Sequence, residues 1–149
     1  MSKRTLVPFL VGVVTLGGIT AGGIAVASAN GRPTLDNSSA HYVAPSDGKA
    51  GSLTFTADVS DDSGILGLKV LAWPASSNLD PTAAELRHAE SAQCESLSDE
   101  KARCTYTLKV TRTQAADLAK GTWYISTLAT AEDGDASFES RAATFEISR

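Results

Sequence analysis

Residues 53–60 read Leu-Thr-Phe-Thr-Ala-Asp-Val-Ser, and residues 61–64 read Asp-Asp-Ser-Gly. Apolar and polar residues alternate over the first eight positions, and this period of two is typical of a β-strand buried on one face. Asp, Ser and Gly are the residue types that build tight turns. The stretch therefore predicts a half-buried strand that ends in a turn.

The same alternation recurs further along this 149-residue chain. Four more strands and a weaker one are expected, over residues 65–73, 104–110, 122–131, 143–147 and 41–43. In the first of them, the side chains expected to share the buried face are Leu66, Leu68, Val70 and Ala72. Asp133-Gly134 is a strong hairpin signal. The pattern predicts a mostly β fold, with one antiparallel β-sandwich.

Two connections carry helical signals. Asp80-Pro81 predicts a helix start, with Asp80 as the N-cap, and an apolar stripe of alanines with Leu86 follows to about residue 90. A second helical turn is expected over residues 113–120, with Thr113 as its cap. We expect both helices to lie in connections of the sandwich.

The first 29 residues set the compartment. Lys3 and Arg4 precede an apolar stretch, residues 6–29, that ends in Ala27-Ser28-Ala29. This is the pattern of a secretory signal peptide, with cleavage expected between Ala29 and Asn30. The alternative is an uncleaved anchor, because a helix over this stretch would be about 36 Å long and a bilayer core is about 30 Å thick.

Both interpretations place the rest of the chain outside the cytoplasm. The protein is expected to be secreted or extracytoplasmic, and to contact a membrane only if the leader is retained. The expected organisation is a signal peptide or anchor over 1–29, a flexible lead-in over 30–37 and the sandwich over 38–149.

The only cysteines, Cys94 and Cys104, fall in the exported part. An even number of cysteines in an oxidising compartment predicts a disulfide. A redox pair favours the closer Cys-x-x-Cys spacing. A zinc site would need further ligands, for which only His41 and His88 are available.

The composition argues against several function classes. Thirteen Lys and Arg against seventeen Asp and Glu give a net charge of −4, so the basic footprint of a nucleic-acid-binding protein is missing. No nucleophile motif lies near His41 or His88, and no glycine-rich phosphate loop follows the leader. We therefore expect no catalytic residues, no cofactor and no enzyme.

Two sequence stretches resemble known domains. Asp61 to Ile65 resembles the passage from strand B to strand C of bacterial extracellular immunoglobulin-like and fibronectin-like domains. Residues 118–134, with Leu118-x-x-Gly121-x-Trp123, resemble their E–F corner, F strand and F–G hairpin. The resemblance covers about residues 38–148. It departs from the family because neither cysteine falls in strand B or F.

As a whole, the chain looks similar to small exported actinomycete proteins grouped as a domain family of unknown function. That resemblance implies secretion and an unassigned role, and it carries no site residues with it.

Acidic side chains gather in two of the expected turns. In an immunoglobulin-like sandwich the B–C and F–G loops lie at the same end, so these turns could meet, although the sequence alone does not decide whether they do. Oxygen-rich loops can hold calcium. The weak calcium candidates are Asp58, Asp61, Asp62, Asp133 and Asp135. The favoured interpretation is that these residues only build turns through local hydrogen bonds.

Trp73 and Trp123 are the largest apolar side chains. Buried, they belong to the core, which is the favoured interpretation; exposed on a sheet face, they would be able to stack on a sugar ring.

The favoured function is an exported, non-catalytic binding or structural module, whose partner is an unknown extracellular protein or a cell-envelope polymer. One alternative is a secreted protease inhibitor that presents the Cys94–Cys104 loop, since a constrained exposed loop is pre-organised for binding. The second alternative is a small cell-envelope hydrolase with an unrecognised site, which would require convergent carboxylates in a cleft.

Overall fold

The structure is a computed structural model, and it describes residues 32–148. The expected signal peptide over 1–29 and its cleavage site between Ala29 and Asn30 lie outside the described residues. Within residues 32–148, no helix is both long enough and apolar enough to span a membrane.

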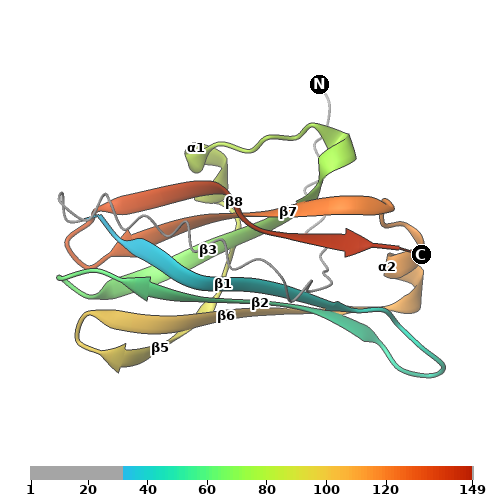
Figure 1. Ribbon diagram of the computed structural model, residues 1–149, viewed down its shortest axis with the longest axis horizontal. Coiled ribbons are helices and arrows are strands. Elements are labelled where there is room, and N and C mark those ends of the chain that lie inside the picture. Colours follow the sequence, from blue (N-terminus) through green and yellow to red (C-terminus); the bar gives the residue numbers. More distant parts are fainter. Residues whose placement is uncertain (1–31, 149) are drawn as a thin grey trace.

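The described chain folds into two four-stranded antiparallel sheets that pack face to face (Figure 1). The strands are β1 (Thr34–Val43), β2 (Gly51–Ser60), β3 (Ile65–Pro74), β4 (Glu90–Ser91), β5 (Gln93–Ser98), β6 (Lys101–Val110), β7 (Gly121–Ala131) and β8 (Ala136–Ile147). The first sheet has the order β1-β2-β6-β5, and the second sheet has the order β4-β3-β7-β8. The predicted antiparallel β-sandwich is confirmed.

The main core lies between the two sheets. The alternating apolar residues of β2 all point inward, and Leu53, Phe55 and Val59 are fully buried. From the second sheet, Trp123 on β7 stacks on Phe145 on β8, with ring centroids 5.7 Å apart. Burying one face of each sheet is what makes the period of two visible in the sequence.

Leu66 was wrongly predicted to face the core, since 63% of its surface is exposed. The register between β3 and β7 shifts between Ile65 and Gly67. A bulge of this kind adds one residue to a strand and reverses the alternation beyond it. Ile65 therefore packs against the core in place of Leu66, while Leu68 is buried as expected.

The lead-in expected over residues 30–37 was wrong from Thr34 onward, because β1 begins there. Apart from Leu35, its first residues are polar, so the sequence shows no alternation there. They pair with the end of β2, in the register Thr34 with Ser60, and a bulge between Asp36 and Ser39 accommodates Asn37 at a positive φ of 55°.

The helix expected from Asp80 to about residue 90 is much shorter. The helix α1 spans Ala83–Leu86, and its N-cap is Thr82, whose side chain accepts a hydrogen bond from the Glu85 N–H. Asp80 has a φ of 41° and lies outside the helix. A cap requires extended backbone, which Thr82 has and Asp80 lacks.

This connection covers the outer face of the second sheet. After a 3₁₀ turn over Ala75–Ser77, the chain crosses above β3 and β7 and returns through α1 (Figure 1). A second, smaller core forms beneath it from Leu71, Trp73, Leu86 and Leu128. Trp73 and Trp123 are thus both buried, as favoured, but in two different cores on opposite faces of one sheet.

The second helical turn begins earlier than expected. The helix α2 spans Arg112–Ala116, and its cap is Thr111, where the sequence predicted Thr113. Thr111 and Gln114 form a reciprocal capping box, in which each side chain bonds to the backbone N–H of the other. The box satisfies two backbone donors at once and thereby fixes the start of the helix.

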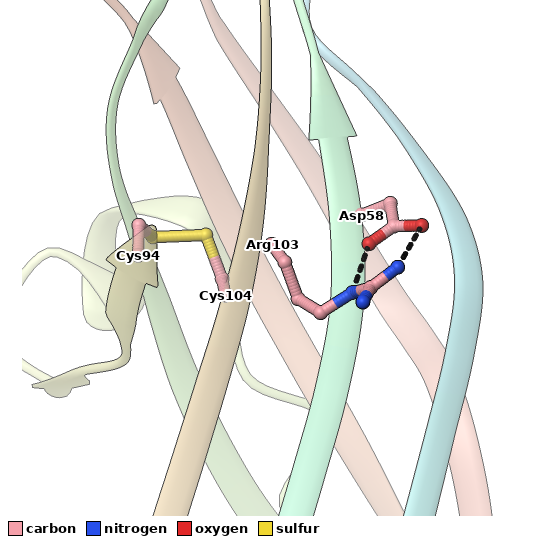
Figure 2. Close-up of a disulfide and its surroundings, with 4 residues drawn as sticks. All are labelled: Asp58, Cys94, Arg103 and Cys104. Carbon is pink, nitrogen blue, oxygen red and sulfur yellow. Dashed lines mark hydrogen bonds and ion pairs between the residues drawn. A yellow bond between two sulfur atoms is a disulfide. The ribbon is translucent and has the colours of Figure 1, made fainter. Parts of the chain in front are cut away.

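Cys94 and Cys104 form a disulfide, as predicted. They lie directly opposite each other on β5 and β6, with Cα atoms 3.9 Å apart (Figure 2). The residues between them form a β-hairpin, so the expected solvated loop is an exposed strand paired along its length with β6. Every residue of β5 is exposed, and the disulfide holds this edge strand against the sheet.

Reducing the disulfide is expected to lower the free energy of unfolding by about 2–3 kcal/mol, because the closed loop no longer restricts the unfolded chain. Urea unfolding with and without reductant measures the change. The variant Cys94→Ser serves as the control, because Cys94 is exposed and the variant should not respond to reductant. Equal stability of reduced and oxidised wild type would contradict this expectation.

Candidate functional site

Two turns from distant parts of the sequence touch at one end of the sandwich. They are the turn between β2 and β3 and the hairpin between β7 and β8. The Glu132 N–H donates to the Gly64 carbonyl at 2.9 Å, and the Asp133 N–H donates to Ser63 Oγ at 3.1 Å. The sequence left open whether the two acidic turns meet, and in the structure they do.

The hairpin between β5 and β6 joins the same end. The Asp61 N–H donates to the Glu100 carbonyl at 2.8 Å. Gly64 has a φ of 100°, and a side chain there would approach both the Asp99 carbonyl and Glu132 at 3.2 Å. Glycine is therefore required at position 64 both for the backbone conformation and for the close approach of the three turns.

We call this region the loop end, defined by residues 61–64, 99–100 and 132–135. Here Asp61, Asp62 and Asp133 each offer a carboxylate oxygen, and the three oxygens lie within 4.8 Å of one another. In the described part of the chain, this is the one group of three potential ligand side chains with such spacing. Asp62 and Asp133 are exposed, whereas Asp61 is buried.

Only one of the two carboxylate oxygens of Asp61 has hydrogen-bond partners among the described residues. Its Oδ2 accepts hydrogen bonds from the Ser63 N–H at 2.9 Å and from the Ser63 hydroxyl at 2.6 Å. Its Oδ1 is buried and has no hydrogen-bond partner among the described residues. A buried carboxylate oxygen without a partner is costly, so it points to a further ligand of this group.

The spacing of the three carboxylates fits a calcium ion. Calcium binds oxygens at about 2.3–2.6 Å, so two oxygens on opposite sides of one ion lie at most about 5 Å apart. Three carboxylates supply three to six of the six to eight oxygens that calcium takes, and water can supply the rest. The loop end therefore has the donor type and the spacing that this cation needs.

Asp58 does not belong to this group, although it is one of the weak calcium candidates predicted from the sequence. It lies on the outer face of the first sheet, directly opposite Arg103 in the register of β2 and β6. Arg103 Nε donates to Asp58 Oδ1 at 2.9 Å (Figure 2). Asn37 Nδ2 donates to Asp58 Oδ2 at 3.0 Å. These bonds join β1, β2 and β6 and commit the carboxylate to a structural role.

Asp135 also lies outside the group of three. Its backbone N–H donates to Asp133 Oδ1 at 2.9 Å, which is the local hydrogen bond of an Asp turn. Asp135 thus helps to orient the Asp133 carboxylate. His41 on β1 and His88 after α1 are both exposed, and neither is part of the group of three.

A second concave feature was not anticipated from the sequence. A pocket of about 340 Å³ opens on the outer face of the second sheet, between the 75–80 segment and β7 and β8. It is lined by Trp73, Ala75, Asn78, Asp80, Tyr124 and Arg141. The one sequence feature that could have indicated an unusual backbone beside this pocket is the pair Asn78 and Asp80. After glycine, Asn and Asp adopt left-handed backbone most readily.

A scan against protein-family models matches residues 35–129 to the family of unknown function DUF5707. The chain belongs to this family. The match in this DUF5707 protein runs from the start of β1 into β7. It includes Asp61 and Asp62 and ends before Asp133 and Arg141. No curated protein and no solved structure matches the chain.

The hydrogen bonds that Asp58 accepts from Arg103 and Asn37 should make the free energy of unfolding depend on pH. The hydrogen bond from Arg103, followed by that from Asn37, holds the pKa of Asp58 below the ordinary value of an aspartate. The stabilisation is complete above the unfolded-state pKa of about 3.9 and is lost as the pH falls through the lower folded pKa. Asp58→Asn should therefore unfold at lower urea concentration than wild type at pH 7, with a difference that shrinks below about pH 4.

The matched control is Asp47→Asn, because Asp47 forms an ion pair with Arg112 at 3.6 Å in which both side chains are exposed. Such pairs contribute little, so this variant should match wild type at every pH. A difference for Asp58→Asn that is the same at pH 3 and pH 7 would contradict a role for its charge.

Proposed function

We propose that this DUF5707 protein is an exported, non-catalytic binding module of immunoglobulin-like topology, and that calcium orders its loop end. The proposal combines the leader sequence, the strand order and the acidic group of three.

The strand order supports the immunoglobulin-like assignment. In chain order β1 to β8 correspond to strands A, B, C, C′, D, E, F and G, so the two sheets become A-B-E-D and C′-C-F-G. The loop end then holds the B–C and F–G loops, which variable domains of this type use to bind their partners.

Export is supported by the basic, apolar and small-residue pattern of residues 1–29. The disulfide between Cys94 and Cys104 is consistent with it, because disulfides persist in oxidising compartments. A source among bacteria, and specifically actinomycetes, is part of the same proposal and rests on the sequence resemblance alone.

The observation that carries the cation is Asp61. Its Oδ1 is buried without a partner in the described structure, while two further carboxylates lie within 4.8 Å of its own. Without a cation these three carboxylates repel one another. A bound calcium ion would satisfy the unpartnered oxygen and join the β2–β3 turn to the β7–β8 hairpin, giving a rigid surface for binding.

Nothing in the described residues specifically favours the protease inhibitor or the hydrolase. The Cys94–Cys104 segment uses its backbone to pair with β6 as a hairpin.

Calcium is expected to stabilise the protein. Extracellular calcium modules have Kd values of about 0.1–1 mM, so 10 mM calcium, roughly 10–100 times Kd, should raise the free energy of unfolding by about 1.4–2.7 kcal/mol. Asp133→Asn should abolish this gain, because it removes the ligand contributed by the second turn. Thermal unfolding with calcium and with chelator measures the effect, and isothermal titration calorimetry measures binding directly.

The control is Asp135→Asn, which removes a carboxylate from the same hairpin but outside the group of three. It should retain most of the calcium response. No calcium response in wild type, or an equal response in Asp133→Asn, would overturn the calcium site.

A further inference from the structure

The pocket on the outer face of the second sheet lies far from the loop end. Its floor includes Trp73, near the end of β3, whereas the loop end adjoins Ile65 at the start of that strand. A strand rises about 3.3 Å per residue, so the two regions are separated by about 25 Å. The pocket and the loop end therefore share no residue and are separate candidate sites.

Three polar side chains of the pocket have no hydrogen-bond or ion-pair partner in the described structure. Arg141, Asn78 and Asp80 are all exposed, and no side-chain hydrogen bond or ion pair engages any of them. The Arg141 guanidinium instead lies 4.3 Å from the centroid of the Tyr124 ring. This contact with the ring favours that position of the guanidinium and leaves its N–H donors available.

The part of the pocket lining that comes from residues 75–80 has an unusual backbone. Asn78 and Asp80 have φ values of 52° and 41°, and they are two of the three residues other than glycine with positive φ in the described chain. Asn78 ends the 3₁₀ turn, which accounts for its conformation. Asp80 has no such role, and it precedes Pro81, which further restricts its backbone.

Strained backbone of this kind persists where the surrounding structure holds it, and it is concentrated at binding sites. Here Leu79 packs on the second core and Pro81 is buried, so Asp80 is held from both sides. The result is an acidic side chain kept at the pocket at a cost in backbone energy.

We infer that this pocket binds an acidic sugar unit of an extracellular polysaccharide. A guanidinium binds a carboxylate through two parallel hydrogen bonds. The Asp80 carboxylate accepts hydrogen bonds from sugar hydroxyls, and the Asn78 amide both accepts and donates them. The volume of about 340 Å³ lies at the lower end of the range for small-ligand sites, which suits a sugar ring.

The inference rests on the proposed role as a binding module, and it names the partner class. A free amino acid would also offer a carboxylate to Arg141, with its ammonium group near Asp80. The exposure of all three polar side chains favours the sugar, because a repeating polymer gains affinity from many weak exposed contacts.

The test is a titration of isotope-labelled protein followed by amide and indole NMR shifts, with D-glucuronate as the probe. Glucose and glycine are the comparison probes, and each titration is run with calcium and with chelator. We expect glucuronate to shift the signals of Tyr124, Arg141 and the Trp73 indole, with glucose and glycine binding more weakly. The shifts should be the same with calcium and with chelator, so a failed calcium site leaves this result readable.

Arg141→Gln should weaken glucuronate binding about tenfold or more, since it removes a charge-assisted hydrogen bond. Arg87→Gln is the matched control. Arg87 is an exposed arginine that follows α1, in the connection that forms one side of the pocket, but it does not line the pocket. The Arg87→Gln variant should bind glucuronate like wild type. The inference is overturned by an absence of pocket shifts with glucuronate, by equal or tighter binding of glucose or glycine, or by undiminished binding in Arg141→Gln.

Discussion

Burial of the inner face of β2 is the constraint on which the rest of the structure depends. This strand lies between β1 and β6, and its residues from Leu53 to Val59 alternate between the core and the outer face of the sheet. A shift of one residue would expose Phe55 and bury the polar positions between, so the register is fixed. With the register fixed, β2 ends at Ser60 and Asp61 is the first residue of the turn. The place of the loop end thus follows from the packing of the core.

The second sheet differs from the first because it is covered on both faces. Its inner face packs on the first sheet, and its outer face packs on the connection that contains α1. This explains why Trp73 is buried while pointing away from the main core, where its indole N–H donates to Ser126 Oγ at 2.9 Å. The same connection that completes the second core also forms one wall of the pocket. The pocket is therefore a consequence of how an unusually long connection closes over the sheet.

The sequence predicted the parts of this fold that periodicity reports, and it failed where another effect decided the structure. Alternation located β2, β6, β7 and residues 143–147 of β8, because each contributes alternate apolar side chains to the main core. It placed Leu66 wrongly because a bulge reverses the alternation, and it missed the first half of β1 because that half is polar. The cap at Asp80 failed because its left-handed backbone is imposed by the packing of its neighbours, which no local pattern records.

The candidate site illustrates the same limit with a single residue type. Five aspartates were proposed as calcium ligands on the ground that they lie in or near turns, and three of them converge. Asp58 is excluded because a residue on a strand meets its cross-strand neighbour, and that neighbour is Arg103. Asp61, three positions later, lies past the end of the strand. Its backbone N–H donates to the neighbouring hairpin, and one of its carboxylate oxygens is buried without a hydrogen-bond partner in the described structure. The chemical difference between a structural carboxylate and a candidate ligand is therefore set by where the strand ends, and the core sets that boundary.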